Sequence, residues 1–413
     1  MIDRHAMMRH TRYDIDLDAI AHNFRQVKAC IHNPVGLSPK TAVVLKADAY
    51  GLGALPVARV LIREGADMLA VACLPEAIQL RQAYDEVPIL IMGHTPSEYF
   101  DEAVSKRITC TIFDYEQAKS LASEAKAQGT IAKAHVKVDT GMNRLGLKPG
   151  LFKSGAFGGD SGFESAALLL ARMAELPGLK LEGAFTHLAL NNRASDAAQF
   201  DMFMNLMEDA AKRGVHFDMR HVCDSIGLMR YPEYRLDLVR PGAVMYGVVP
   251  MNTPLSQSID IRTPFRFSTR ISRLRPLSAG EGVGYDYTWK APEEGALVAT
   301  LPVGYADGYK RCLSNVASVV VRGRRAPVVG LICMDQCNVD VSAVPGVSEG
   351  DEVLLLGGWA KDKPEACIPV LEMASWGSTN RNDVICSVGR RVPRAYSEGG
   401  RIVSVSEHVL GGV

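Results

Sequence analysis

The sequence predicts an α/β protein with an N-terminal (β/α)8 barrel of the TIM type over residues 12–262 and a C-terminal, mostly antiparallel β domain over residues 263–413. Two observations predict this architecture. Between residue 41 and about residue 247, short apolar runs of β type alternate with polar or amphipathic stretches long enough for helices, which is typical of parallel βα units. After about residue 262, apolar runs follow one another across short Gly/Pro turns, as in antiparallel sheets.

The first region contains eight strand candidates, the number that closes a barrel. They are Thr41–Ala47, Met68–Cys73, Val87–Gly93, Ile108–Phe113, Ala134–Asp139, Leu179–His187, Met219–Ser225 and Leu238–Gly247. The segments PEAIQLRQAYDE and FDYEQAKSLASEAKAQG carry apolar residues at i, i+3 and i+4 spacing, which predicts amphipathic helices. An open doubly wound sheet is the main alternative, but the fingerprint GxGxxG is missing from the first strand–helix turn.

The second region is predicted from the runs RFSTRISRLRPL, ALVATLPVGY, ASVVVRG, APVVGLICMDQCNVDVS and DEVLLLGG. No helix-length segment separates them, and the first one to follow is PVLEMASWG. We therefore expect a β domain with a helix near its end.

Composition excludes several classes of protein. The 413 residues are 47% hydrophobic and carry 46 basic and 46 acidic side chains, so we expect no net field that would attract nucleic acid or an anionic membrane. The nine cysteines form no CxxC pair, and Cys333 and Cys337 lack nearby His or Cys partners, so no metal site is expected. The polar start MIDRHAMMRH and the absence of an apolar run of ~20 residues predict a cytoplasmic protein.

The segment TAVVLKADAYGLG places Lys46 at the carboxyl end of the first strand candidate, with Tyr50 four residues later. An amine that is partly desolvated at such a position has a lowered pKa and is available for covalent catalysis. A surface lysine just past a strand end is the structural alternative.

Functional groups of a barrel gather at the carboxyl ends of its strands. At those positions the sequence has an amine, guanidiniums, an imidazole, hydroxyl groups and a turn glycine, namely Lys46, Tyr50, Arg144, His187, Ser225, Arg240 and Gly242. The set suits an anionic aromatic cofactor that attaches to lysine, which is pyridoxal phosphate. Taken singly, His187 could be a core histidine, Arg240 a solvated arginine and Arg144 a structural turn residue.

Longer motifs make the chain similar to one known family. They are YDIDLDAIAHNF, VVLKADAYGLG, HVKVDTGMNRLG, THLA, RLDLVRPGAVMYG, VGYDYTW, LPVGYADGY, ICMDQ and RRVPRAY. Through them, nearly the whole chain resembles the alanine racemases, which are pyridoxal-phosphate enzymes of fold type III. The resemblance implies a barrel with a β domain, a small amino-acid substrate, and a head-to-tail homodimer in which the β domain completes the partner's active site.

The resemblance also implies roles for individual residues. Lys46 matches the lysine that carries the cofactor and acts as one catalytic base, and Tyr285 matches the other base. Cofactor-binding roles fall on Tyr50, Arg144, His187, Ser225, Arg240, Gly242, Ala243 and Asn382. Roles at the substrate or its entrance fall on Arg144, Tyr285, Tyr305, Met334 and Asp335. His221 matches a histidine that hydrogen-bonds Arg240 from behind, and Lys137 matches a lysine that is carbamylated in related racemases.

Two of these residue types fit the chemistry of racemisation. The α-carbon needs a base on each face, so one lysine does not suffice, and a tyrosine with a pKa of ~10 acts as a base at neutral pH only if cations lower that pKa. Arg144 and His187 are the candidates for this effect. Arg240 stays protonated and cannot give the pyridine nitrogen a proton, which weakens the electron sink and disfavours transamination.

Three positions depart from the family pattern. Leu52 replaces the histidine of YGHG, and Asp224 stands where asparagine is commoner, which brings a carboxylate near the phosphate. Asn382, in TNRND, stands where alanine racemases usually carry tyrosine. Neutral drift explains Asn382 as well as a roomier, more polar substrate pocket does. Because serine-accepting members are similar in carrying asparagine here, a serine or mixed alanine/serine racemase is the alternative.

Two further functions compete with an amino-acid racemase. A barrel-only pyridoxal-phosphate-binding protein without turnover would not need residues 263–413. A basic-amino-acid decarboxylase would place an acidic group at the pyridine nitrogen, and Arg240 speaks against that. Supply of D-alanine for the cell wall is the family expectation.

Overall fold

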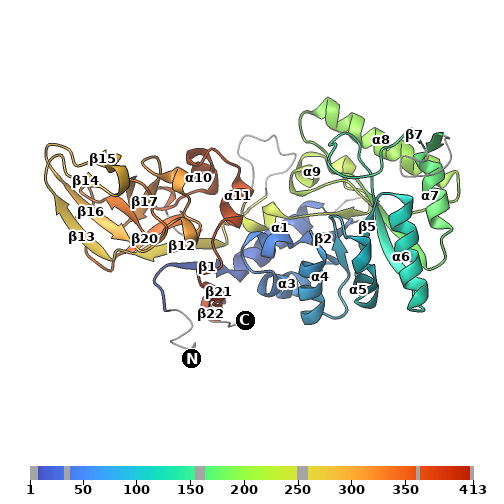
Figure 1. Cartoon of the computed structure of the whole chain (residues 1–413), viewed down its shortest axis with the longest axis horizontal. Helices are drawn as coiled ribbons and strands as arrows, with labels where there is room; N and C mark the ends of the chain where they lie inside the picture. Colours follow the sequence, from blue (N-terminus) through green and yellow to red (C-terminus); the bar gives the residue numbers. More distant parts are fainter. Residues whose placement is uncertain (1–7, 32–37, 154–162, 249–258, 360–362, 410–413) are drawn as a thin grey trace.

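The computed structural model describes residues 8–31, 38–153, 163–248, 259–359 and 363–409. The chain forms two parts, with a helix-covered barrel at one end of the molecule and a β-rich part at the other (Figure 1). This arrangement confirms the predicted fold class. The boundary between residues 262 and 263 stays a prediction.

All eight predicted barrel strands form, and hydrogen-bonded neighbours run parallel. They are β2 (Lys40–Val44), β3 (Met68–Val71), β4 (Ile89–Ile91), β5 (Cys110–Ile112), β6 (Ala132–Lys137), β9 (Leu179–Phe185), β10 (Met219–His221) and β11 (Leu238–Val239). Two groups of four, β11–β2–β3–β4 and β5–β6–β9–β10, close into a ring. Thr109 N donates to Ile89 O at 2.9 Å across one seam, and Arg240 N donates to Cys223 O at 2.9 Å across the other.

The last predicted strand, Leu238–Gly247, was too long. Only β11 is extended, and residues Ala243–Tyr246 form the 3-10 helix η4. Pro241 interrupts the strand because it has no N–H to donate to a neighbouring strand.

Helices cover the outside of the barrel (Figure 1). They are α1 (Leu17–Ile31), α3 (Ala54–Arg63), α4 (Leu74–Ala83), α5 (Phe100–Ser105), α6 (Tyr115–Ala127), α7 (Ala166–Ala174) and α8 (Arg193–Ala211). Both predicted amphipathic helices are confirmed as α4 and α6. The start of α6 is specified locally, because the Asp114 carboxylate accepts a hydrogen bond from Gln117 N at 2.8 Å. Strands β3 and β4 are buried on both faces, as the helical cover requires.

The second part is a ten-stranded sheet in the order β13–β16–β19–β18–β17–β20–β12–β1–β21–β22. The strands are β1 (Arg12–Asp16), β12 (Phe265–Arg270), β13 (Arg273–Leu277), β16 (Ala296–Leu301), β17 (Ser318–Val321), β18 (Arg324–Val329), β19 (Cys337–Asp340), β20 (Glu352–Gly357), β21 (Arg394–Glu398) and β22 (Arg401–Ser406). The pairs are antiparallel except β1–β21, which is parallel. Strand β1, from the start of the chain, therefore lies among strands from its end.

Two short helices accompany this sheet. The segment PVLEMASWG forms α10 (Val370–Trp376), which confirms the predicted helix, and α11 (Arg381–Cys386) follows it. Asn380 caps α11, since its side-chain oxygen accepts from Asn382 N at 2.9 Å and from Asp383 N at 3.0 Å. Asp383 in turn accepts a hydrogen bond from the Thr379 hydroxyl and pairs with Lys310. These contacts hold α11 in place.

Arg394 of β21 joins the two parts of the molecule. Its side chain is fully buried and donates to Gly51 O at 3.0 Å and to Val388 O at 2.8 Å. Gly51 closes the turn that carries Lys46, and α11 packs so close to this turn that a Cβ on Gly51 would lie 2.9 Å from Ile385 O. The β domain thus supports the barrel end of its own chain.

Candidate active site

A cavity of about 560 Å³ opens at the carboxyl end of the barrel strands. Ten residues singled out from the sequence line it: Lys46, Tyr50, Lys137, Arg144, His187, Ser225, Arg240, Gly242, Ala243 and Asn382. Four others, from the β domain, do not line it: Tyr285, Tyr305, Met334 and Asp335. The cavity is therefore built by the barrel and by α11, without the β-domain motifs of the same chain.

Lys46 lies on a strained turn. The first strand ends at Val44, three residues before its predicted end, because the four residues after Lys46 all have left-handed φ, between 53° and 57°. Such a backbone costs ~1–2 kcal/mol per residue, and strain of this kind is retained at functional sites. Hydrogen bonds from Ala47 N to Glu76 and from Ala54 N to Asp48, both 2.7 Å, hold the turn.

Burial lowers the pKa of Lys46, and the Arg144 guanidinium lowers it further. The carboxylates of Glu76 and Asp224 act in the opposite direction. The lysine is therefore the partly desolvated amine that the strand-end position predicts. A neutral amine is the form that reacts with a carbonyl group.

Arg240 is a buried donor beside the cavity. Its side chain donates to Thr186 O at 2.9 Å and to Val222 O at 2.8 Å, and it hydrogen-bonds His221 Nδ1 at 2.8 Å. Burial lowers the pKa of Arg240 to about 10, so the guanidinium remains charged at neutral pH. His221 stands behind Arg240, as the resemblance implies.

The tautomers of two buried histidines follow from this arrangement. Burial and the Arg240 charge hold the pKa of His221 well below its usual value, so the ring is neutral. Because a guanidinium only donates, His221 Nδ1 accepts and the ring proton sits on Nε2. That proton points at His135 Nδ1, 2.8 Å away, which leaves the other nitrogen of His135 facing Glu182 at 3.7 Å. This series of hydrogen-bonded side chains ends at Lys133, whose partly exposed ammonium group pairs with Glu182 at 2.6 Å.

Lys137 and His187 occupy the same cationic end of the cavity. Burial, then the charges of Arg240 and Arg144, lower the pKa of Lys137 to about 7. Its Nζ donates to Val138 O at 2.9 Å. Burial lowers the pKa of His187 to about 4, so this imidazole is neutral at pH 7. His187 therefore adds no charge at pH 7 to a cluster that already holds two guanidiniums, and Lys137 adds about half a charge.

The opposite end of the cavity offers hydroxyl groups and open backbone. Ser225 Oγ accepts from Gly242 N at 2.8 Å, which leaves the hydroxyl proton for a ligand. Burial raises the pKa of Tyr50, so its phenol stays a donor. A Cβ at Gly242 would lie 2.9 Å from Tyr50 Oη, so only glycine leaves this space open. These donors fit an anionic group, and the lysine at the other side fits an aldehyde, so the residues present fit pyridoxal phosphate.

The predicted β-domain residues lie on exposed turns. Tyr285 is 64% exposed in η5 (Tyr285–Tyr287), between β14 (Gly282–Val283) and β15 (Trp289–Lys290). Figure 1 shows β14 and β15 at the end of the molecule that is remote from the barrel. Tyr305 and Met334 are also exposed.

The turns that carry Tyr305 and Met334 form one unit. Ala306 N donates to Met334 O at 3.0 Å, and the buried Asp307 accepts from Arg391 at 2.7 Å. Arg391 also pairs with Asp335 at 2.7 Å. The motifs GYADGY and CMDQ are therefore fixed to each other on the surface of the β domain.

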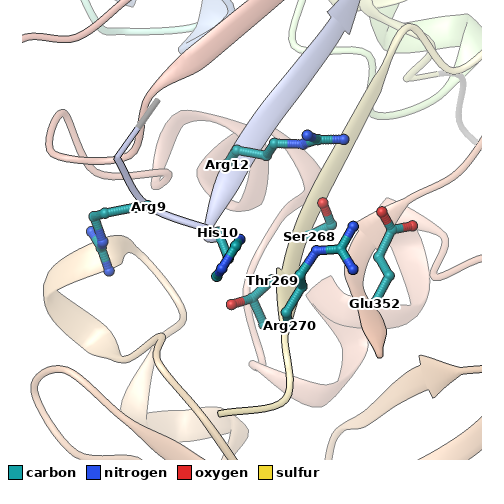
Figure 2. A pocket seen from close by; sticks show the side chains of 7 residues that line it. All are labelled: Arg9, His10, Arg12, Ser268, Thr269, Arg270 and Glu352. Carbon is teal, nitrogen blue, oxygen red and sulfur yellow. The ribbon is translucent and has the colours of Figure 1, made fainter. Parts of the chain in front are cut away.

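A second cavity of about 110 Å³ lies between the N-terminal segment and the large sheet (Figure 2). It is rich in cations, but these already have partners: Arg9 donates to Asp307 at 2.7 Å, Arg12 to Asp14 at 3.0 Å, and Arg270 to Gly350 O at 2.7 Å. Its side chains stabilise the fold and do not add to the candidate site.

Sequence reasoning missed Arg381 and Phe185 among the residues that line the large cavity. Phe185 precedes a predicted strand end by two residues, so the alternation of side chains along a strand gives a signal for it. Arg381 does not follow a strand of the barrel, so the strand-end rule does not predict it. The only sequence signal for it is its neighbour Asn382, which was assigned to the site by the resemblance.

The barrel, its cationic cavity and the lysine on a strained strand-end turn define the class of this protein: a pyridoxal-phosphate enzyme built on a (β/α)8 barrel. The family model described as "Alanine racemase, N-terminal domain" matches residues 15–250, and "Alanine racemase, C-terminal domain" matches residues 265–396. The chain therefore belongs to the alanine racemase family. It is a pyridoxal-phosphate-dependent isomerase that interconverts L- and D-alanine.

Individual relatives cover nearly the whole chain. An alanine racemase of Desulfovibrio desulfuricans is 42% identical over 388 residues, which are 93% of this chain and 97% of the relative. One of Desulforamulus reducens is 38% identical over 386 residues, 93% of this chain and 98% of the relative. The solved alanine racemase of Clostridium difficile 630 superposes with a TM-score of 0.88 at 30% identity, covering 98% and 100%. That of Bacillus anthracis with bound L-Ala-P gives 0.84 at 28%, covering 98% and 99%.

Proposed function

We propose that this chain racemises alanine with two bases, Lys46 on one face of the α-carbon and the partner subunit's Tyr285 on the other. The lowered pKa of Lys46 inside a cationic cavity is the observation that carries the proposal. The exposure of Tyr285, remote from the cavity of its own chain, supports a contribution to another subunit. A head-to-tail homodimer follows from these two positions.

Pyridoxal phosphate, when bound, supplies the electron-withdrawing ring that makes the α-proton acidic. Lys46 would hold it covalently, and Tyr50, Ser225, Gly242 and Ala243 would hold its phosphate. Arg240, charged and donor-only, would face the ring nitrogen without giving it a proton. Because His221 accepts from Arg240 and cannot take on charge, it fixes the guanidinium in that role.

Arg144 would orient the substrate. Its guanidinium lies near Lys46, Lys137 and His187, and it contributes to the lowered pKa of each of them. A guanidinium in a partly desolvated cavity can hold a carboxylate through two parallel hydrogen bonds, which favours one orientation of the substrate.

Mixed subunits test the composite site. Lys46→Ala and Tyr285→Phe chains should each be inactive alone, and random mixing should recover about a quarter of wild-type activity, because half of the dimers are mixed and each contains one intact site. Tyr287→Phe, an equally exposed neighbour in the same turn, is the control and should not need complementation. No recovery after demonstrated subunit exchange would mean that each site is built from one chain.

The alternatives lose support. The match of the C-terminal family model to residues 265–396 speaks against a barrel-only binding protein, and the relatives named above are alanine racemases, so serine as the main substrate has no support. Among the residues that the structure describes, none of the helices combines the length and the apolar composition that a bilayer crossing requires. A cytoplasmic location and a role in cell-wall supply belong to the proposal.

A further inference from the structure

The active-site cavity contains a cation that the sequence did not predict. Arg381, the first residue of α11, lines the cavity and is partly buried. Within the described parts of the chain, its guanidinium makes no hydrogen bond or ion pair. A partly desolvated guanidinium without a partner is unfavourable unless an anion binds beside it.

Its neighbours assign Arg381 to one end of the cavity. Arg381, Tyr50 and Asp224 line the same cavity, and α11 packs against the turn that follows Tyr50. Burial lowers the pKa of Arg381, and the Asp224 carboxylate acts against this effect. Tyr50 Oη faces Gly242, and Asp224 directly precedes Ser225, so both lie beside the hydroxyl groups and open backbone of the cavity. Arg144 lowers the pKa values of Lys46, Lys137 and His187, which are not among the groups that act on Arg381, so we assign the two guanidiniums to different groups.

Asp224 explains why this end needs an extra cation. Its Oδ1 caps α9 (Ser225–Arg230) by accepting from Ile226 N at 3.0 Å and Gly227 N at 2.8 Å. The carboxylate thus has a structural role, but it brings a negative charge to the place where a phosphate would sit. An asparagine could make the same cap without the charge.

We propose that Arg381 is a ligand of the cofactor phosphate and that it offsets the charge of Asp224 at that end of the cavity. The proposal rests on the proposed function, since it takes pyridoxal phosphate as the molecule that fills the cavity. A guanidinium can give two parallel N–H groups to a phosphate, which hydroxyl donors such as those of Tyr50 and Ser225 cannot do. The cofactor site of this chain would then be held by hydroxyl groups, backbone and one arginine.

Cofactor affinity, measured without turnover, tests the proposal. The cofactor-depleted chain is titrated with pyridoxal phosphate and with pyridoxal, and the change in absorbance gives each dissociation constant. Arg381→Ala should bind pyridoxal phosphate about 10- to 100-fold more weakly and pyridoxal as well as wild type does, the size expected for one charge-assisted hydrogen bond. Asp224→Asn in the Arg381→Ala background should recover part of the loss. Arg390→Ala, which removes an exposed arginine nearby, should bind both compounds like wild type.

Each other outcome has a defined meaning. Unchanged affinity for pyridoxal phosphate, or an equal loss for both compounds, overturns the assignment of Arg381 to the phosphate. A raised KM for alanine with unchanged cofactor affinity would assign Arg381 to the substrate carboxylate instead and also overturns it. If Arg381→Ala folds poorly by circular dichroism, Arg381→Gln gives the same comparison. A wild-type chain that binds neither compound would contradict the proposed function itself.

Discussion

The candidate functional side chains of the barrel are mostly buried, whereas those of the β-domain motifs are exposed. Arg240 is 3% and Lys137 5% exposed, while Tyr285 is 64% and Met334 53% exposed. In the barrel, burial sets which groups are charged, and a single chain suffices for that. In the β domain the candidate functional motifs have a rigid base, and they do not line the large cavity of their own chain. The comparison teaches that one end of this chain holds a nearly complete site, and under the proposed function the other end would complete the site of a second subunit.

Removing Lys46 should have the largest effect, because it deletes the reactive amine at the buried end. Lys46→Ala should lose about 10³-fold or more in kcat/KM, near the upper range for a proton-transferring group. The wild-type protein should be yellow, and borohydride should fix the cofactor on Lys46. Lys290→Ala, at an exposed position in β15, should keep both properties. Label on Lys137 or Lys290 would contradict the assignment.

Asn382 lines the cavity of the buried site but is itself exposed. A substitution there tests whether the edge of the cavity selects between alanine and serine. A serine hydroxyl that finds a partner gains roughly 0.5–1.5 kcal/mol, and one buried without a partner loses roughly 1–3 kcal/mol. Asn382→Tyr should therefore reduce any serine turnover about ten- to a thousandfold relative to alanine. A racemisation assay with both amino acids measures the ratio. Equal slowing of both would mean that Asn382 does not select the substrate.

Lys137 tests whether the cationic end needs a negative charge. Its pKa of about 7 makes neutral amine available to react with CO2, and the resulting carbamate would pair with Arg144 in place of repelling it. Lys137→Ala should then lose about 10- to 100-fold in kcat/KM through a misplaced guanidinium. A well-resolved crystal structure should show the carbamate. Unmodified density at Lys137 would reject the prediction.

The pH dependence of stability gives an independent measure of Lys137. If the amine is unmodified, its pKa of about 7 lies below the ordinary value of 10.5, so the unfolded chain binds more protons between these limits. Stability should then rise with pH from about 7 to about 10.5 and the rise should be smaller in Lys137→Met. If Lys137 is carbamylated, unfolding also releases CO2, so the stability of wild type, and not that of Lys137→Met, would depend on the CO2 concentration.

Asp307 should have the smallest of these effects, and it concerns the β-domain side of the comparison. Burial opposes ionisation, but hydrogen bonds from Arg9 and Arg391 lower the pKa of Asp307. Both arginine side chains are 33% exposed, so Asp307→Asn should cost about 1–3 kcal/mol of unfolding free energy, less than a wholly buried ion pair.

The sign with pH follows from the lowered pKa of Asp307. The stabilisation is present above the unfolded value of about 3.9 and is lost as pH falls through the lower folded value, so the difference between wild type and Asp307→Asn should shrink below about pH 4. Asp335→Asn is the control, because its carboxylate is 61% exposed, and it should change stability by about 0.5 kcal/mol or less. An equal effect of both variants would show that burial of Asp307 is unimportant.

Much of the barrel site could be predicted because parallel strands deliver their carboxyl ends to one edge. Once eight strands were located, Lys46, His187, Ser225 and Arg240 had to meet there, and the cavity contains all four. Strand ends were less predictable. The extended run through Ala47 looked continuous in sequence, but tertiary hydrogen bonds to Glu76 hold that segment in a left-handed turn.

Sequence alone determined the order of strands and helices, the lysine at the first strand end and the cofactor class, because periodicity and residue chemistry are local properties. Only the tertiary structure decided that β1 lies between β12 and β21, that burial keeps His221 neutral, and that Arg381 reaches the cavity from α11. These outcomes depend on burial and on contacts between residues far apart in the chain. Burial determines the pKa values of the site residues, and contacts between distant residues determine which side chains donate hydrogen bonds. No single segment of the sequence determines either property.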